Sequence, residues 1–134
     1  FCPLNKSLDA SRVGLVTTAA PYKPDAGEQG ARAPYNAAAK FYQVYCSPSD
    51  RDQFLGISHL GYDRVYSTAE DINAFFPLVA LREAAAQGRI GDLAPRYYGA
   101  PTNRSQVTTI RQDCADILQM MREDEVDLAI LVPS

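Results

Sequence analysis

The only histidine of the chain lies in a short run that is rich in polar side chains. His59 is followed by Asp63, and Asp71 and Asn73 come shortly afterwards. An imidazole can act as a general acid or base near neutral pH, and a neighbouring carboxylate can orient it or bind a cationic group. We therefore interpret His59 and Asp71 as candidate catalytic residues, and Asp63 and Asn73 as candidate substrate-binding residues.

Each of these residues also has a structural interpretation. A loop histidine can cap backbone carbonyls, and Asp71 and Asn73 can hold a tight turn through side-chain to backbone hydrogen bonds. The run from Ser67 to Glu70 resembles a capping box, in which Glu70 would be structural. A divalent metal held by His59 and nearby carboxylates is a third interpretation, but their spacing matches no ligand motif, so we expect no metal site.

Two threonines end the first strand that the sequence predicts. Residues 11–18 (SRVGLVTT) are almost wholly apolar around one glycine, which is typical of a strand buried on both faces of a parallel sheet. In open α/β sheets the carboxyl ends of the strands face the ligand crevice. Thr17 and Thr18 are therefore candidate substrate-binding residues. Residues 19–34 predict a long loop, whose glycines lack the spacing of a nucleotide site.

Strand and helix patterns alternate along the rest of the chain. Residues 53–58 (QFLGIS) predict a strand, and Pro77 opens an amphipathic helix that ends at Gly88. Residues 105–123 predict the longest helix. Residues 126–132 (VDLAILV) predict the clearest strand, which we expect to be central and buried.

The segments between these elements predict less regular structure. Residues 90–94 suggest a short turn, and residues 96–103 a loop in which the adjacent Tyr97 and Tyr98 point different ways, one into the core and one to the surface. The order strand, long loop, strand, helix, helix, strand predicts an α/β three-layer sandwich with a mostly parallel sheet. Flavodoxin-like or Rossmann-like strand order is the expected subtype.

The composition is that of an ordinary globular domain. The 134 residues are 46% hydrophobic and 22% charged, with a net charge of −3. The sequence contains no cluster of Lys and Arg for nucleic acid and no apolar run long enough to cross a membrane. The chain starts at Phe1 and stops directly after an apolar strand. We therefore expect residues 1–134 to be a single domain, truncated or disordered at both ends.

Three separate cysteines form no CxxC pair: Cys2, Cys46 and Cys114. This usage is typical of reduced thiols in a cytoplasmic protein and not of a disulfide scaffold. Cys114 falls on the apolar face of the helix predicted for residues 105–123, so we expect a buried and inert thiol. That face comprises Val107, Ile110, Cys114, Ile117, Leu118 and Met121.

Three long phrases of the sequence resemble a known family. They are SRVGLVTTAAPY, ISHLGYDRVYSTAEDINAFFPLVALREAAAQGRIGDLAPRYYG and VDLAILVPS. Together they resemble the glycine/sarcosine/betaine reductase selenoprotein B family, which includes the D-proline reductase selenoprotein subunit. The resemblance extends over residues 11–134, and its most specific part is the order of His59, Tyr62, Asp63, Asp71, Asn73, Pro77 and Gly88.

The resemblance implies an oxidoreductase that cleaves a bond to the amine carbon of an amino acid or betaine. A selenocysteine or cysteine would do this chemistry, and in the family it follows the strand at residues 126–132. We therefore expect the redox residue after Ser134 and identify no cofactor within the chain. The implied partners are a small amine or amino-acid-like substrate and other reductase subunits, and His59 would lower the thiol pKa or donate a proton.

A non-catalytic binding or scaffold subunit of the same fold is the alternative interpretation. It is motivated by the absence of a catalytic cysteine motif from these residues. We also expect a homo-oligomer, since α/β subunits of this size often dimerise, and we expect no nucleic-acid or membrane partner.

Overall fold

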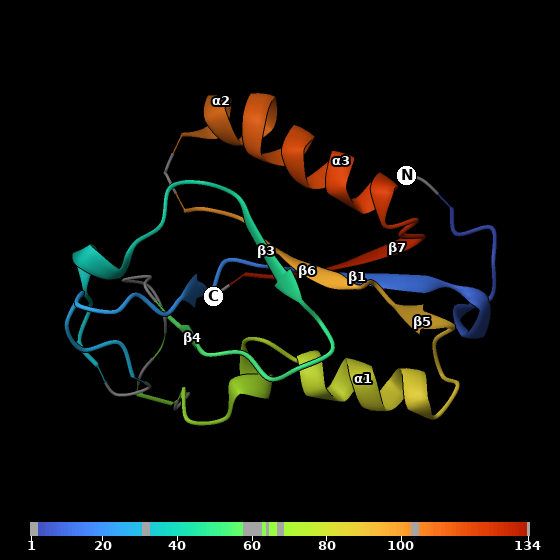
Figure 1. Ribbon diagram of the computed structural model, residues 1–134, viewed down its shortest axis with the longest axis horizontal. Coiled ribbons are helices and arrows are strands. Elements are labelled where there is room, and N and C mark those ends of the chain that lie inside the picture. Colours follow the sequence, from blue (N-terminus) through green and yellow to red (C-terminus); the bar gives the residue numbers. More distant parts are fainter. Residues whose placement is uncertain are drawn as a thin grey trace.

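A curled, mostly parallel sheet forms the centre of the computed structural model, which describes residues 3–30, 33–57, 63, 65–66, 69–102 and 105–133. The strands of the sheet are β1 (Arg12–Thr17), β3 (Tyr45–Pro48), β5 (Asp92–Leu93), β6 (Arg96–Gly99) and β7 (Leu128–Val132). β1 pairs in parallel with β7 along one side, and with β5 and then β6 along the other. β3 joins β6 as an antiparallel edge (Figure 1).

β1 is central because both of its faces are apolar. Val13, Leu15 and Val16 are all buried, although their side chains alternate between the two faces of the sheet. Gly14 leaves room for a neighbour, since a Cβ there would meet the Val126 side chain at 3.0 Å. The strand predicted for residues 11–18 is confirmed.

Helices lie on both faces of the sheet (Figure 1). α1 (Leu78–Ala86) covers one face, where Leu15, Phe76 and Tyr97 form the core. The other face carries a continuous helical segment made of α2 (Gln106–Thr108), the π-helical η4 (Thr109–Asp113) and α3 (Cys114–Glu123). Both helices predicted from the sequence are confirmed, and the structure is a mixed α/β fold. No helix in the described part of the chain is long and apolar enough to cross a membrane.

Smaller elements surround the sheet. They are the 3₁₀ turns η1 (Leu8–Ala10), η2 (Ala37–Ala39) and η3 (Ile72–Ala74), and the strands β2 (Ala20–Pro21) and β4 (Leu55–Gly56). β2 and β4 pair with each other as a separate two-stranded antiparallel sheet. The strand predicted for residues 53–58 is therefore present but short, and it lies outside the main sheet.

The prediction of a turn at residues 90–94 and a loop at residues 96–103 is wrong. These segments contain β5 and β6, which pair with β1. Tyr97 and Tyr98 are only 1% and 0% exposed, because the sheet is covered on both faces and adjacent strand residues both reach a core. Asp92 and Arg96 are polar, so these segments show no continuous apolar strand pattern in the sequence. Both strands form through pairing with β1 more than through intrinsic strand propensity.

Within the described residues β7 is neither central nor fully buried, so the prediction of a central, buried strand is wrong for this part of the protein. Among the described residues β7 pairs only with β1, so it is an edge strand. Its side chains alternate between half-buried and exposed, and Leu131 is 71% exposed. A continuous apolar run cannot distinguish an edge strand from a central one. It indicates that other parts of the protein cover the side chains, but not whether a strand pairs on each side.

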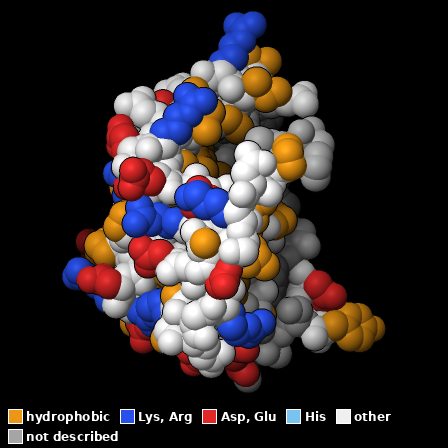
Figure 2. Space-filling model, turned by 90° about the vertical axis from the view of Figure 1, so that its right-hand side faces the viewer, with side chains coloured by type: hydrophobic (Ala, Val, Ile, Leu, Met, Phe, Trp, Pro, Cys, Tyr) orange, Lys and Arg blue, Asp and Glu red, His pale blue; other side chains and the backbone are white. Residues whose placement is uncertain are grey.

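Ion pairs close the amino end of the sheet. Lys6 lies 2.7 Å from Asp127, and Arg12 lies 3.3 Å from Asp92 and 3.4 Å from Glu125. Figure 2 shows basic and acidic side chains interspersed over this side of the molecule. The charges are largely paired with one another, so this end has the character of a solvated surface.

Candidate functional site

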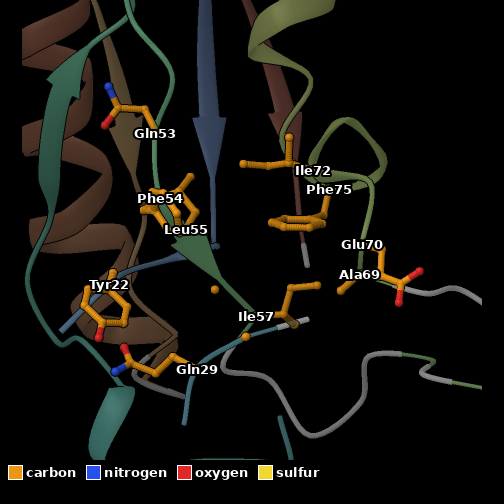
Figure 3. A pocket seen from close by; sticks show the side chains of 12 residues that line it. Tyr22, Gln29, Gln53, Phe54, Leu55, Ile57, Ala69, Glu70, Ile72 and Phe75 are labelled. Atoms are coloured by element: carbon orange, nitrogen blue, oxygen red, sulfur yellow. The ribbon is translucent and has the colours of Figure 1, made fainter. Parts of the chain in front are cut away.

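A pocket of about 320 Å³ opens beyond the carboxyl end of β1 (Figure 3). Three segments line it, namely Tyr22 with Gln29 and Gly30, residues 53–57, and residues 69–75 in part. This volume suits a small molecule, and the carboxyl end of a parallel sheet is the usual place for a ligand in an open α/β fold.

The floor of the pocket is apolar and continuous with the core. Leu55, Ile57, Ala69 and Ile72 pack against the core cluster that contains the buried Phe75. Because these side chains share contacts with the interior, the floor is held in place by the same packing that supports α1.

Two aromatic side chains and one carboxylate stand around this floor. Figure 3 places Tyr22 and Phe54 on one side of the pocket and Glu70 on the other. Phe54 is 88% exposed, which is unfavourable for a large apolar ring unless another molecule covers it. Aromatic faces and a carboxylate both attract cations, so the arrangement suits a small ligand that carries an ammonium group.

Backbone pairing between β2 and β4 positions the aromatic side. Ala20 is opposite Gly56, and the Tyr22 N–H donates to the Phe54 carbonyl at 3.3 Å. Gln29 braces the adjacent loop: its side-chain oxygen accepts from the Lys23 N–H at 2.8 Å, and its amide nitrogen donates to the Lys23 carbonyl at 2.7 Å. The amide of Gln29 is therefore used in the scaffold of the pocket.

Two tyrosines, the buried Tyr97 and the partly buried Tyr45, belong to the core cluster against which the pocket floor packs. The Tyr45 hydroxyl donates to the Ala19 carbonyl at 2.8 Å, and the Tyr97 hydroxyl donates to Gln53 Oε1 at 3.4 Å. Burial raises the pKa of Tyr45 and of Tyr97 above the usual value, so both remain protonated donors at neutral pH. Tyr45 ties the loop after β1 to β3, and Tyr97 ties β6 to the segment before β4. Neither hydroxyl can serve as a general base.

Asp71, Asn73 and Asp63 occupy turns in the structure. Asp71 Oδ1 accepts from the Asn73 N–H at 2.9 Å and caps η3, while Asp63 Oδ1 accepts from the Val65 and Tyr66 N–H groups at 3.0 and 3.1 Å. The turn-holding interpretation is therefore confirmed for Asp71, whereas the Asn73 side chain donates to the Asp71 side chain at 3.2 Å. These residues do not line the pocket, although Asp71 lies between Glu70 and Ile72, which do. Their catalytic or binding use stays a prediction.

The two threonines lie away from the pocket. Thr17 is buried, and its hydroxyl accepts from the Ala19 N–H at 3.0 Å. Both Thr17 and Thr18 line a different, apolar groove beside α3 and β7. His59 lies outside the described residues, as do Ser67 and Thr68 of the proposed capping box, so their roles also stay predictions.

The cysteines differ from expectation at one position. Cys114 is exposed, so the prediction of a buried thiol is wrong. Its helix packs on the sheet through Ile117, and the apolar face continues past that contact to Cys114. Cys46 is also exposed, and Cys2 lies outside the described residues. Within the described ranges no three His, Cys, Asp or Glu side chains gather as a metal site.

Sequence reasoning missed the aromatic side of the pocket. Tyr22 lies in a stretch that was predicted only as a loop, and Phe54 within a predicted strand. One signal was available: adjacent strand residues point to opposite faces, so Phe54 and Leu55 could not both enter one core. Glu70 was considered, but as a helix cap or a metal ligand.

The fold and the pocket together define a class, an α/β fold with a pocket beyond the carboxyl end of its central strand. Residues 7–134 match the model of the glycine/sarcosine/betaine reductase selenoprotein B family, and the chain belongs to this family. The resemblance seen in the sequence is confirmed.

Two curated relatives share one description with each other. The glycine reductase complex component B subunit gamma of Symbiobacterium thermophilum is 28% identical over a 134-residue alignment that covers 96% of this chain and 30% of the relative. The protein of that description from Carboxydothermus hydrogenoformans is also 28% identical, with 96% and 29% covered. The chain thus spans less than a third of the length of these relatives. No solved structure matches the chain.

Proposed function

We propose that this chain is part of an oxidoreductase subunit that cleaves a bond to the amine carbon of a small amino acid or betaine, in the cytoplasm and with partner subunits. Family membership supports the reaction class, and both relatives are described as subunits of a glycine reductase complex. The observation that carries the substrate class is the pocket, with its apolar floor, its aromatic side and Glu70.

The residues of the site have distinct roles in this proposal. Glu70 attracts the ammonium group of the substrate, and Tyr22 and Phe54 present their rings to it. Asp71 orients the histidine of the same loop. A thiolate or selenolate attacks the amine carbon, and the amine leaves with the electrons of the broken bond. Because the substrate nitrogen is already cationic, the amine leaves as a neutral molecule and needs no proton. His59 takes up the proton of the thiol or selenol, which lowers the pKa of that group and keeps the nucleophile ionised.

The redox residue of this proposal lies outside residues 1–134. We place it after β7, at the same end of the sheet as the pocket, because the strands that flank β1 on both sides run parallel to it. We also propose that the sheet belongs to a flavodoxin-like three-layer sandwich. The order β6–β1–β7, with α1 and α3 on opposite faces, supports that topology.

Ligand titration of the native full-length subunit tests the substrate class. We expect betaine to bind at least about tenfold more tightly than 3,3-dimethylbutanoate, which has the same shape without the positive charge. Glu70→Gln should remove most of this preference. Glu83→Gln on the exposed face of α1 is the matched control and should preserve it. Equal binding of the two compounds, or an unchanged preference in Glu70→Gln, would refute the pocket as the ammonium site.

The alternative is a non-catalytic binding subunit, and one observation favours it. Neither of the described cysteines, Cys46 and Cys114, lines the pocket. The two functions predict different outcomes when the full-length subunit is combined with its partner subunits and a dithiol. Amine release from betaine supports the reductase, whereas betaine binding without release supports the scaffold.

A further inference from the structure

An apolar groove of about 410 Å³ runs between α3 and β7, on the face of the sheet away from α1. Its lining includes Thr18, Cys114, Leu118, Met121, Leu131 and Pro133. We refer to it as the α3–β7 groove. Leu118 and Leu131 are 47% and 71% exposed, so large apolar side chains from both walls face an unfilled space.

The helix beside the groove has an apolar stripe wider than its contact with the sheet. Val107, Ile110, Cys114 and Leu118 follow at intervals of three or four residues, and all are exposed. This stripe lies next to Ile117, which is buried on the sheet. A helix that is apolar beyond its visible contacts normally packs against a further element.

The backbone of β7 is open along the same side. The Val132 carbonyl accepts from the Thr18 N–H at 3.4 Å, so this residue points to β1. Alternate residues of a parallel ladder point in opposite directions, and the N–H groups of Ala129 and Leu131 therefore point away from β1. An uncharged apolar edge of this kind is prone to pair with another strand.

Chain handedness identifies what would fill the groove. The connection from β6 to β7 passes across β1 with α2 and α3 on one face. A further right-handed crossover that continues in the same direction must place its helix on that same face, over the groove, and its strand on the free edge of β7. Pro133, which directly follows β7, already lines the groove.

We propose that the α3–β7 groove and the free edge of β7 form a docking surface for a helix and a parallel strand of the same polypeptide, which follow β7 in the full-length protein. The chain covers only 30% and 29% of its two relatives, so members of this family contain ample further polypeptide. This inference goes beyond the proposed function, because it requires neither the redox residue nor the pocket.

The two described cysteines provide a matched test. Cys114 lines the groove, whereas Cys46 is exposed on β3. In the native full-length protein we expect N-ethylmaleimide to modify Cys46 quickly and Cys114 at least about tenfold more slowly, because a docked helix covers only the latter. Site-resolved mass spectrometry measures both rates, and modification in denaturant confirms that both thiols can react.

Variants and hydrogen exchange complete the test. Leu118→Gln should weaken the docking and speed the modification of Cys114 severalfold without changing Cys46, and Val65→Gln, at an exposed site outside the groove, should change neither. Slow exchange of the Ala129 and Leu131 amides would show the added strand without any substitution.

Equal modification rates for the two cysteines would overturn the proposal. Protection of Cys114 that disappears on dilution would also overturn it, since a second copy would then be the occupant.

Discussion

At the residue scale, a partly buried charged cluster around Asp124 has a clear structural role. Asp124 Oδ2 accepts from the Tyr98 hydroxyl at 2.6 Å and from Arg96 Nε at 2.7 Å. Arg96 also reaches Glu123 at 2.9 Å. Burial, followed by the bond to Asp124, raises the pKa of Tyr98 above its usual value, so its hydroxyl stays a donor. The cluster joins β6 to the end of α3.

Removal of Asp124 should therefore destabilise the protein. Asp124→Ala leaves the hydroxyl of the fully buried Tyr98 without its acceptor, and we expect a loss of about 2 kcal/mol in the free energy of unfolding. Glu123→Ala removes an exposed ion pair with Arg96 and an exposed hydrogen bond from Gln119, and it should cost clearly less than Asp124→Ala. Urea unfolding measures both variants. Equal losses would mean that the buried bond to Tyr98 contributes nothing beyond the ion pair.

Asp71 can be tested for two roles at once. It caps η3 through a side-chain oxygen, which an asparagine can also provide. Asp71→Asn should keep the free energy of unfolding within about 0.5 kcal/mol, whereas Asp71→Ala should lose about 1 kcal/mol. If the carboxylate orients His59, Asp71→Asn should also lower turnover of the full-length subunit more than about tenfold. Full turnover in a stable Asp71→Asn protein would restrict Asp71 to its turn.

At the scale of elements, β1 and β7 begin at a shared carboxylate. Asp127 Oδ2 accepts from the Arg12 N–H at 3.0 Å and from Lys6 Nζ at 2.9 Å. The hydrogen bond from Lys6 is the main cause that lowers the Asp127 pKa from its ordinary 3.8, and the Arg12 N–H adds to it. The segment that precedes β1 is therefore linked to the start of β7 through the Asp127 side chain.

This link should make stability depend on pH in the acid range. Because the folded-state pKa of Asp127 is lowered, the folded state binds fewer protons than the unfolded state. Its contribution to stability is therefore present above pH 3.8 and is lost as pH falls further. Asp127→Asn should reduce stability near neutral pH and show a smaller further loss in acid. Urea unfolding at about pH 6 and about pH 3 compares the two proteins, and parallel losses would contradict the assignment.

At the scale of the whole molecule, the surfaces around the sheet have different characters. The amino end is closed by paired charges, the carboxyl end opens into the pocket, and the α3 face carries the α3–β7 groove. The proposed ligand site and the proposed docking surface therefore use separate residues. The pocket can lose its ligand without opening the groove, and the groove can be exposed without changing Glu70, so the two proposals can fail independently.

Periodic, strongly apolar segments were predictable because their patterns report burial directly. β1, α1 and the helix at residues 105–123 follow from side chains that repeat at strand or helix spacing. The family was also readable, since the order of residues around Asp71 and Pro77 is a property of the sequence alone. The capping of η3 by Asp71 follows equally from local chemistry.

Tertiary pairing decided the rest. β5 and β6 are only two and four residues long, too short to show a periodic pattern, and they form because β1 supplies their hydrogen-bond partners. The exposure of Cys114 and the edge position of β7 depend on which surfaces meet, and a local apolar pattern contains no information about its neighbour. The pocket brings Tyr22, Phe54 and Glu70 together from separate segments, so only the folded chain could reveal it.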